Sequence, residues 1–102
     1  MIARTWRGAV RAQDAEAYAV YVRRTGLAGY RTTPGNRGAW LLYRADGDLA
    51  EVMTVSLWDS MASIQGFAGD DVTRAVFYPD DDRYLVDRDL EARHWTVVEP
   101  PV

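Results

Sequence analysis

The sequence predicts an α+β fold of the ferredoxin-like type, in which strands and helices follow the order βαββαβ around an antiparallel sheet. Strand-like patterns cover residues 2–10, residues 39–58 with one interruption, and residues 90–98. Apolar residues at helical spacing occupy the two stretches between them. The 102 residues suit one domain, which we expect to span positions 1–102.

The first strand is expected to have two different faces, because successive side chains of a strand point to opposite sides of the sheet. One face comprises Ile2, Arg4, Trp6 and Gly8, and the other comprises Ala3, Thr5, Arg7 and Ala9. The following helix is predicted to begin at Asp14, whose carboxylate can cap the first turn. Its apolar stripe consists of Ala15, Tyr18, Ala19 and Val22. We expect Gly26 and Gly29 to end or break this helix.

Two strands and a second helix are predicted next. The strands, residues 39–45 and 49–58, flank the turn sequence Asp-Gly-Asp at 46–48, which is a signal for a hairpin. Asp59 or Ser60 is predicted to cap the helix. The buried side of this helix is expected to consist of Met61, Ile64 and Phe67 or Ala68.

The last third of the chain is predicted to be less regular. Gly69 is expected to end the second helix, and residues 72–77 are expected to form one more helical turn. The acidic run 80–82 is interpreted as a solvated loop that caps a short helical piece over 83–86. The final strand is predicted over 90–98 because apolar residues alternate there again.

Apolar side chains are expected on both faces of the sheet. In the second strand, for example, Trp40 and Leu42 alternate with Leu41 and Tyr43. The two helices can cover one face only, and an uncovered apolar face would form a large adhesive patch. We therefore expect a homodimer in which the sheets of two copies face each other.

Composition excludes several classes of function. Twelve arginines against fifteen acidic residues give a net charge of -3, so neither nucleic acid nor a membrane surface is expected as a partner. The absence of cysteine excludes disulfides, thiol nucleophiles and zinc–thiolate sites, and His94 is the one histidine. Phosphate-binding glycine loops and the serine nucleophile elbow are absent from the sequence. Without a signal peptide or a membrane-spanning apolar run, a cytoplasmic protein is expected.

Five segments together resemble a known family. They are Arg4-Thr5-Trp6-Arg7-Gly8, Pro34-Gly35-Asn36-Arg37-Gly38, Leu57-Trp58-Asp59-Ser60, Ile64-Gln65-Gly66-Phe67-Ala68-Gly69 and Arg93-His94-Trp95-Thr96-Val97. With these segments, residues 2–98 resemble the antibiotic biosynthesis monooxygenases of the dimeric α/β-barrel superfamily. The resemblance implies a pocket between the helices and the sheet of each protomer of a dimeric barrel.

The resemblance also implies a chemistry. Some members oxidise phenolic or polycyclic aromatic substrates with O₂ and need neither flavin nor metal, because the deprotonated substrate supplies the electrons. On that basis we expect a small aromatic, polyketide- or quinone-like ligand and no cofactor. Other members degrade haem, but the positions that match their functional tryptophan and their iron-ligating histidine are Phe67 and Phe77 here. Haem degradation by that route is therefore disfavoured.

Three residues are candidates for catalysis. His94 has the one side chain whose unperturbed pKa is near neutrality, so it is a candidate base for a phenolic or enolic proton. The alternative is a structural histidine that bonds to backbone under a helix or at the dimer interface. The indole N–H of Trp6 can donate to a carbonyl or to a reduced oxygen species, although a tryptophan in the middle of a strand is commonly part of the core.

Arg4 shares the face of Trp6, and its role depends on what covers that face. Under the helices, Arg4 would need a ligand anion, an enolate or a structural carboxylate. At the dimer interface it would pair with Glu51 or Glu91 of the other subunit. The walls of a ligand pocket are predicted to come from Tyr43, Trp58, Phe67 and Phe77, for which core packing is the alternative.

The sequence thus favours a cofactor-independent monooxygenase with His94 as base and with Trp6 and Arg4 as polarising groups. The alternative is a non-catalytic member of the same fold, either a ligand-binding protein or a structural homodimer.

Overall fold

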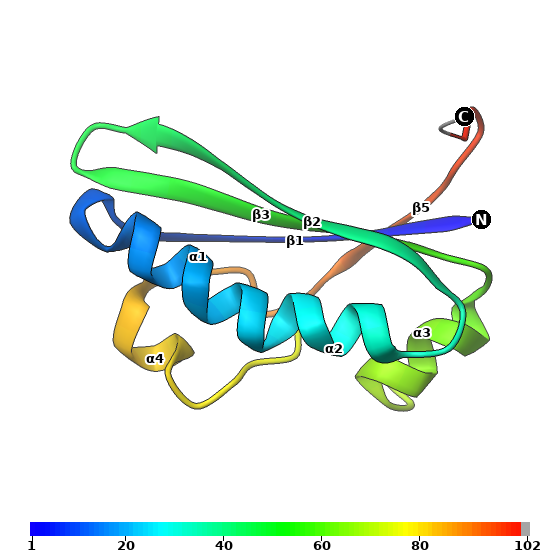
Figure 1. Ribbon diagram of the computed structural model, residues 1–102. Helices are drawn as coiled ribbons and strands as arrows, with labels where there is room; N and C mark the ends of the chain where they lie inside the picture. The colour runs from blue at the N-terminus through cyan, green and yellow to red at the C-terminus, as the bar shows by residue number, and fades with distance from the viewer. Residues whose placement is uncertain (101–102) are drawn as a thin grey trace.

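Three long antiparallel strands form the centre of the molecule, which a computed structural model describes over residues 1–100 (Figure 1). They are β1 (Ile2–Arg11), β2 (Asn36–Asp46) and β3 (Leu49–Trp58), and β3 lies between the other two. The turn between β2 and β3 contains Gly47 with a φ of 59°. Two-residue hairpin turns require such left-handed backbone, so the predicted hairpin is confirmed.

The other edge of β1 pairs with two short strands. β4 (Leu85–Arg88) pairs with the C-terminal half of β1, and β5 (Arg93–Thr96) pairs with its N-terminal half. The sheet order is therefore β2-β3-β1, followed by β4 and β5 on the same edge. The predicted final strand over 90–98 is shorter than expected. The helical piece predicted over 83–86 is wrong in its second half, because the chain enters β4 there.

All helices lie on one side of the sheet (Figure 1). A single 3-10 turn, η1 (Ala12–Asp14), leads into α1 (Ala15–Arg24) and α2 (Gly26–Thr32). The layer is completed by α3 (Met61–Ala68) and α4 (Asp81–Tyr84). The core between helices and sheet consists of Val10, Tyr18, Val22, Leu27, Tyr30, Ala39, Ala50, Val52, Trp58, Ile64 and Leu85. This arrangement confirms the ferredoxin-like α+β class.

No helix within residues 1–100 combines the length and the apolar character that crossing a membrane requires.

The first helical region differs from its prediction at both ends. Asp14 has helical backbone angles, φ −97° and ψ −4°, as the last residue of η1. A capping residue needs extended backbone to turn its side chain onto the helix, so the predicted Asp14 cap is wrong. Thr25 separates α1 from α2, which confirms a break beside Gly26. Gly29, in contrast, lies inside α2 and does not end it.

The second predicted helix is α3, and its capping signals are confirmed. The side chain of Ser60 accepts a hydrogen bond from the backbone N–H of Ser63 at 3.2 Å. Gly69 follows the helix with a φ of 83°. Ile64 is fully buried as predicted, whereas Met61 is 39% exposed, so its assignment to the buried side is wrong.

Residues 72–78, called the covering segment below, run along the helix side of the sheet without regular secondary structure. The helical turn predicted over 72–77 is therefore wrong. The backbone N–H of Ala92 donates to Thr73 at 2.7 Å, and that of Ala75 donates to Leu90 at 3.0 Å. These distant partners satisfy backbone groups that a helical turn would have paired locally.

Among residues 1–100, no helix lies on the second face of the sheet (Figure 1). Trp40, Leu42 and Trp95 project from it with exposed fractions of 46%, 50% and 52%. The pairing of Trp40 with Val55 and of Leu42 with Met53 continues this apolar surface across β2 and β3. The sheet is thus apolar on both faces.

Candidate functional site

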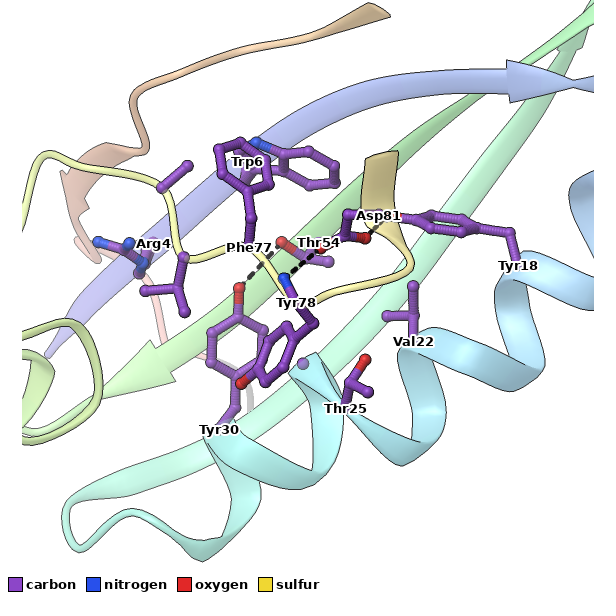
Figure 2. Close-up of a pocket in the computed structure, with 13 residues that line it drawn as sticks. Arg4, Trp6, Tyr18, Val22, Thr25, Tyr30, Thr54, Phe77, Tyr78 and Asp81 are labelled. Carbon is purple, nitrogen blue, oxygen red and sulfur yellow. Dashed lines mark hydrogen bonds between the residues drawn. The ribbon is translucent and has the colours of Figure 1, made fainter. Parts of the chain in front are cut away.

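A cavity lies between the helix layer and the sheet (Figure 2). Its volume is about 30 Å³, which is room for about two water molecules. The volume is about 420 Å³ when the adjoining space that is open to solvent is included. The walls come from β1, β3, α1, α2, the covering segment and the start of α4. Five aromatic side chains contribute to them, namely Trp6, Tyr18, Tyr30, Phe77 and Tyr78.

Arg4 enters the cavity from β1, on the face that the helices cover. It is 2% exposed, and its Nη2 donates to the carbonyl oxygen of Arg74 at 3.0 Å. Its Nη1 donates to the carbonyl oxygen of Val72 and lies 2.9 Å from Nε2 of His94. The buried Nε has no hydrogen-bond partner within residues 1–100. Arg4 therefore holds the covering segment against the sheet.

The charge of Arg4 is not neutralised by a carboxylate. Its guanidinium forms no salt bridge with any acidic side chain in the described part of the chain. Burial lowers the pKa of Arg4, because desolvation penalises the charged form. Arginine nevertheless stays protonated in proteins. The cavity thus contains a buried positive charge, and this arrangement suits a negatively charged ligand group.

The dimer-interface alternative for Arg4 is wrong, because Arg4 is buried on the face that the helices cover, where it bonds to the covering segment. Glu51 accepts hydrogen bonds from Arg7 and, at 2.7 Å, from Arg44. The hydrogen bond from Arg7 is the main reason why the pKa of Glu51 is lowered. Glu91 forms no salt bridge with any cationic side chain among residues 1–100.

His94 lies directly opposite Arg4 in the pairing of β1 with β5. Because arginine can only donate, Nε2 of His94 accepts, and the proton of the neutral ring is on Nδ1. Burial, and then the positive charge of Arg4, lower the pKa of His94. The imidazole is therefore neutral at pH 7, but its accepting nitrogen faces Arg4. His94 is not among the residues that line the cavity.

Trp6 contributes its ring to the cavity wall. The ring meets Phe77 edge to face, with centroids 6.0 Å apart. The indole N–H donates to the carbonyl oxygen of Asp89 at 2.8 Å. The surface that Trp6 presents to the cavity is therefore aromatic, and its N–H is engaged elsewhere.

Of the four predicted pocket walls, Phe77 lines the cavity. Phe67 packs against the ring of Tyr30, with ring centroids 4.5 Å apart. Trp58 is fully buried in the core. Tyr43 is 68% exposed and lies away from the cavity, in the hairpin formed by β2 and β3.

Polar groups that sequence reasoning did not select also line the cavity. Tyr30 and Thr54 share a hydrogen bond of 3.2 Å between their hydroxyl oxygens. The hydroxyl of Tyr18 donates to Oδ1 of Asp81 at 2.9 Å. Asp81 is only 6% exposed, so interpreting the whole acidic run as solvated is wrong for this residue. The sequence does contain a signal for a buried partner of Tyr18. Tyr18 lies on the apolar stripe of its predicted helix, and a buried tyrosine hydroxyl needs a hydrogen-bond partner.

Comparisons with solved structures show the same fold in other proteins. Rv0793 from Mycobacterium tuberculosis aligns over 99% of this chain and 98% of its own, with 15% identity and a TM-score of 0.63. A Bacillus cereus protein assigned by name to the antibiotic biosynthesis monooxygenases aligns over 100% and 95%, with 16% identity and a TM-score of 0.64. A variant of MhuD, solved with two manganese protoporphyrin IX molecules per active site, aligns over 100% and 99%, with 15% identity and a TM-score of 0.63. No protein-family model and no curated protein matches the sequence.

Proposed function

We propose that this chain, which has the fold of the antibiotic biosynthesis monooxygenases, binds an aromatic polyketide- or quinone-like molecule in its cavity. The bound molecule carries an ionisable oxygen, and its anion supplies electrons to O₂ without a cofactor. For a substrate with an activated methylene group, the carbon becomes a carbonyl and the second oxygen atom leaves as water. The protein holds the anion and keeps water away from it.

The observation that carries this proposal is the buried guanidinium of Arg4. A fixed positive charge in a site of low dielectric constant stabilises a phenolate or enolate far more than the same charge does in water. Arg4 lines the cavity, and its Nε lacks a partner among residues 1–100. Aromatic side chains line the same cavity, as a flat ligand requires.

In this proposal the three candidate residues act in different ways. Arg4 binds the oxyanion, and the ring of Trp6 packs against the aromatic part of the ligand. His94 keeps Arg4 in place through the contact of 2.9 Å. As long as Arg4 holds Nε2 of His94, this nitrogen is not available to a ligand. We therefore replace the role of base, which the sequence suggested for His94, by that of a residue that positions Arg4.

Binding of an aromatic ring requires the covering segment to move. A cavity that accepts a benzene ring measures on the order of 150 Å³, whereas this cavity measures about 30 Å³. The covering segment has no regular secondary structure, and Arg4 donates two of the hydrogen bonds that hold it, beside the backbone hydrogen bonds to Leu90 and Ala92. A ligand anion that takes over the guanidinium releases the two hydrogen bonds from Arg4, so binding and opening are coupled.

The proposal includes a homodimer that forms through the open face of the sheet. Trp40, Leu42 and Trp95 supply an apolar surface on that face. A second copy of the chain presents the same surface, so a two-fold axis matches like residues across the interface. The arginines around Glu51 form a polar network beside this surface.

Haem does not fit the residues of this cavity. Phe77 packs against Trp6 and offers no iron ligand, and the guanidinium carbon of Arg88 lies 4.7 Å from the centroid of the Phe77 ring. His94 already accepts a hydrogen bond from Arg4. The porphyrin complex of MhuD therefore does not guide the chemistry proposed for this chain.

A second candidate function is favoured by the size of the cavity. A volume of about 30 Å³ also suits a structural homodimer whose interior is filled by its own side chains. In that case the buried Arg4 only anchors the covering segment.

Oxygen uptake separates the two functions. Wild type is mixed with anthrone or hydroquinone, and O₂ consumption is compared with that of Arg4→Met and of Arg11→Met, a matched control at the exposed end of β1. The proposal predicts uptake by wild type and Arg11→Met and a loss of at least about tenfold in Arg4→Met, since a stabilised oxyanion is worth several kcal/mol. Wild type that neither binds nor oxidises these compounds supports the structural homodimer. Equal rates in wild type and Arg4→Met would contradict the role of Arg4.

A further inference from the structure

Asp81 is a buried carboxylate at the opposite end of the cavity from Arg4 (Figure 2). It is 6% exposed, whereas its neighbours Asp80 and Asp82 are exposed. Its Oδ1 accepts from the hydroxyl of Tyr18 at 2.9 Å, and its Oδ2 accepts from the backbone N–H of Tyr78 at 2.7 Å. The carboxylate is thus held in one orientation at the cavity wall.

No cation neutralises this carboxylate within residues 1–100. Arg88, on the neighbouring strand β4, pairs with the exposed Asp82 at 2.7 Å instead. A buried charge is expensive unless it is paired or hydrogen-bonded, and each carboxylate oxygen can accept more than one hydrogen bond. Each oxygen of Asp81 uses one acceptor position for Tyr18 or Tyr78, so acceptor capacity remains.

The cavity therefore has a positive pole at Arg4 and a negative pole at Asp81. Between the poles lie the hydroxyls of Tyr30 and Thr54 and the ring of Phe77. Removal of a proton from a carbon conjugated to a carbonyl is assisted by this pair of groups, a base at the proton and a cation at the oxygen where charge develops.

We propose that Asp81 is the general base of the cavity and that its substrate is an aromatic ketone with an acidic C–H bond remote from its carbonyl oxygen. This inference rests on the proposed function. The C–H bond of the substrate breaks, the proton passes to a carboxylate oxygen of Asp81, and the electron pair remains on the substrate. The pair delocalises to the oxygen that faces Arg4.

Arg4 makes this proton transfer feasible. A carboxylate is a weaker base than a phenolate or an enolate, so proton transfer to it depends on stabilisation of the substrate anion. Stabilisation of the substrate anion by a buried guanidinium offsets this difference. Neither pole accomplishes the reaction by itself, so loss of either group is expected to abolish it.

Tyr18 acts as a positioning residue for Asp81. Burial and the neighbouring carboxylate raise the pKa of Tyr18, so its hydroxyl stays protonated and continues to donate. The ring of Tyr18 is fixed in turn by Tyr84, with centroids 5.6 Å apart. Removal of the hydroxyl leaves the carboxylate in place but less well oriented.

The test measures proton abstraction without oxygen. Anthrone is incubated with the protein in D₂O under nitrogen, and ¹H NMR follows the exchange of its methylene protons for deuterium. Anthrone binding and thermal melting are recorded for wild type, Asp81→Asn and Tyr18→Phe, with Asp80→Asn as the matched control. We expect Asp81→Asn to lose at least about 100-fold in exchange rate with anthrone still bound, Tyr18→Phe to lose less, and Asp80→Asn to match wild type.

The outcomes distinguish this inference from the proposed function. A folded Asp81→Asn protein that exchanges at the wild-type rate overturns the base assignment, even if oxygen uptake depends on Arg4. Wild type that does not bind anthrone overturns the proposed function and this inference with it. If Asp81→Asn does not fold, Asp81→Glu decides, because it keeps the carboxylate. A folded Asp81→Glu protein is expected to exchange faster than buffer, and exchange at the buffer rate would contradict the proposal.

Discussion

At the scale of single residues, Arg4 and His94 form a unit. The imidazole accepts from the guanidinium, and the guanidinium reaches the covering segment. Protonation of His94 would place two positive charges 2.9 Å apart at Nη1 and Nε2. The neutral ring is thus part of what makes a buried arginine tolerable at this position.

The first prediction concerns the pH dependence of stability. Burial and Arg4 lower the pKa of His94 from its ordinary value of 6.5, so the unfolded chain binds a proton more tightly than the folded one. The free energy of unfolding therefore falls as the pH drops through 6.5. The contribution of His94 stops changing once the pH is below the pKa of His94 in the folded protein. Urea unfolding of wild type and His94→Gln at pH 8 and pH 5.5 is expected to show a larger loss for wild type. Equal losses would contradict the Arg4–His94 contact.

Sequence reasoning at this scale identified residues more reliably than roles. Arg4, Trp6 and Phe77 were candidate site residues, and all three line the cavity. They could be selected because strand parity and apolar patterning depend on local sequence. The roles depend on distant partners. The indole of Trp6 bonds to Asp89, and Asp81 is buried by Tyr18, which is 63 positions away in the chain. A single sequence contains no record of such pairs.

At the scale of elements, α2 is packed against the covering segment at one glycine. A Cβ atom built at Gly29 would lie 2.7 Å from the hydroxyl of Tyr78 and 3.1 Å from the ring of Phe67. At Gly26, in the same helix, the nearest atom is 3.9 Å away. Close approach of α2 therefore depends on Gly29 and not on Gly26.

The second prediction uses this matched pair. Gly26→Ala is expected to raise stability by up to about 1 kcal/mol, because alanine favours helix. Gly29→Ala is expected to lower it by about 1–3 kcal/mol, since Tyr78 and Phe67 must shift. Thermal melting of the two variants checks both signs. An equal rise in melting temperature for both would show that Tyr78 does not pack on α2 as described.

Elements with local signals were predicted well, and the others were not. The hairpin at Gly47 and the cap at Ser60 depend on one or two neighbouring residues, and both are confirmed. Residues 72–77 contain a helix-like pattern, but their backbone bonds to residues 90–92 and to Arg4. Tertiary partners overrode the local preference there. Pairing with β1 likewise placed residues 85–88 in β4, where the local pattern had predicted helix over 83–86.

At the scale of the whole molecule, the two faces of the sheet differ in what lies on them. The helix-covered face holds the cavity, and the open face holds Trp40, Leu42 and Trp95. In our proposal the tryptophans on the open face serve dimerisation, whereas Trp6 packs against the ligand.

The third prediction concerns the oligomeric state. Wild type is expected to sediment as a dimer at micromolar concentration, and Trp40→Glu as a monomer, because the substitution buries an unpaired charge at the interface. Val20→Glu, a change on the outer side of α1, is expected to remain dimeric. Sedimentation velocity distinguishes these states. A monomeric wild type would contradict the dimer.

The central claim is that the cavity at Arg4 takes an aromatic anion. Its most direct test is a titration of ¹⁵N-labelled protein with anthrone, followed by amide chemical shifts. The account predicts shifts at Arg4, Thr54 and the covering segment, and none of comparable size in Arg4→Met. Shifts confined to the open face around Trp40, or no shifts at all, would contradict it.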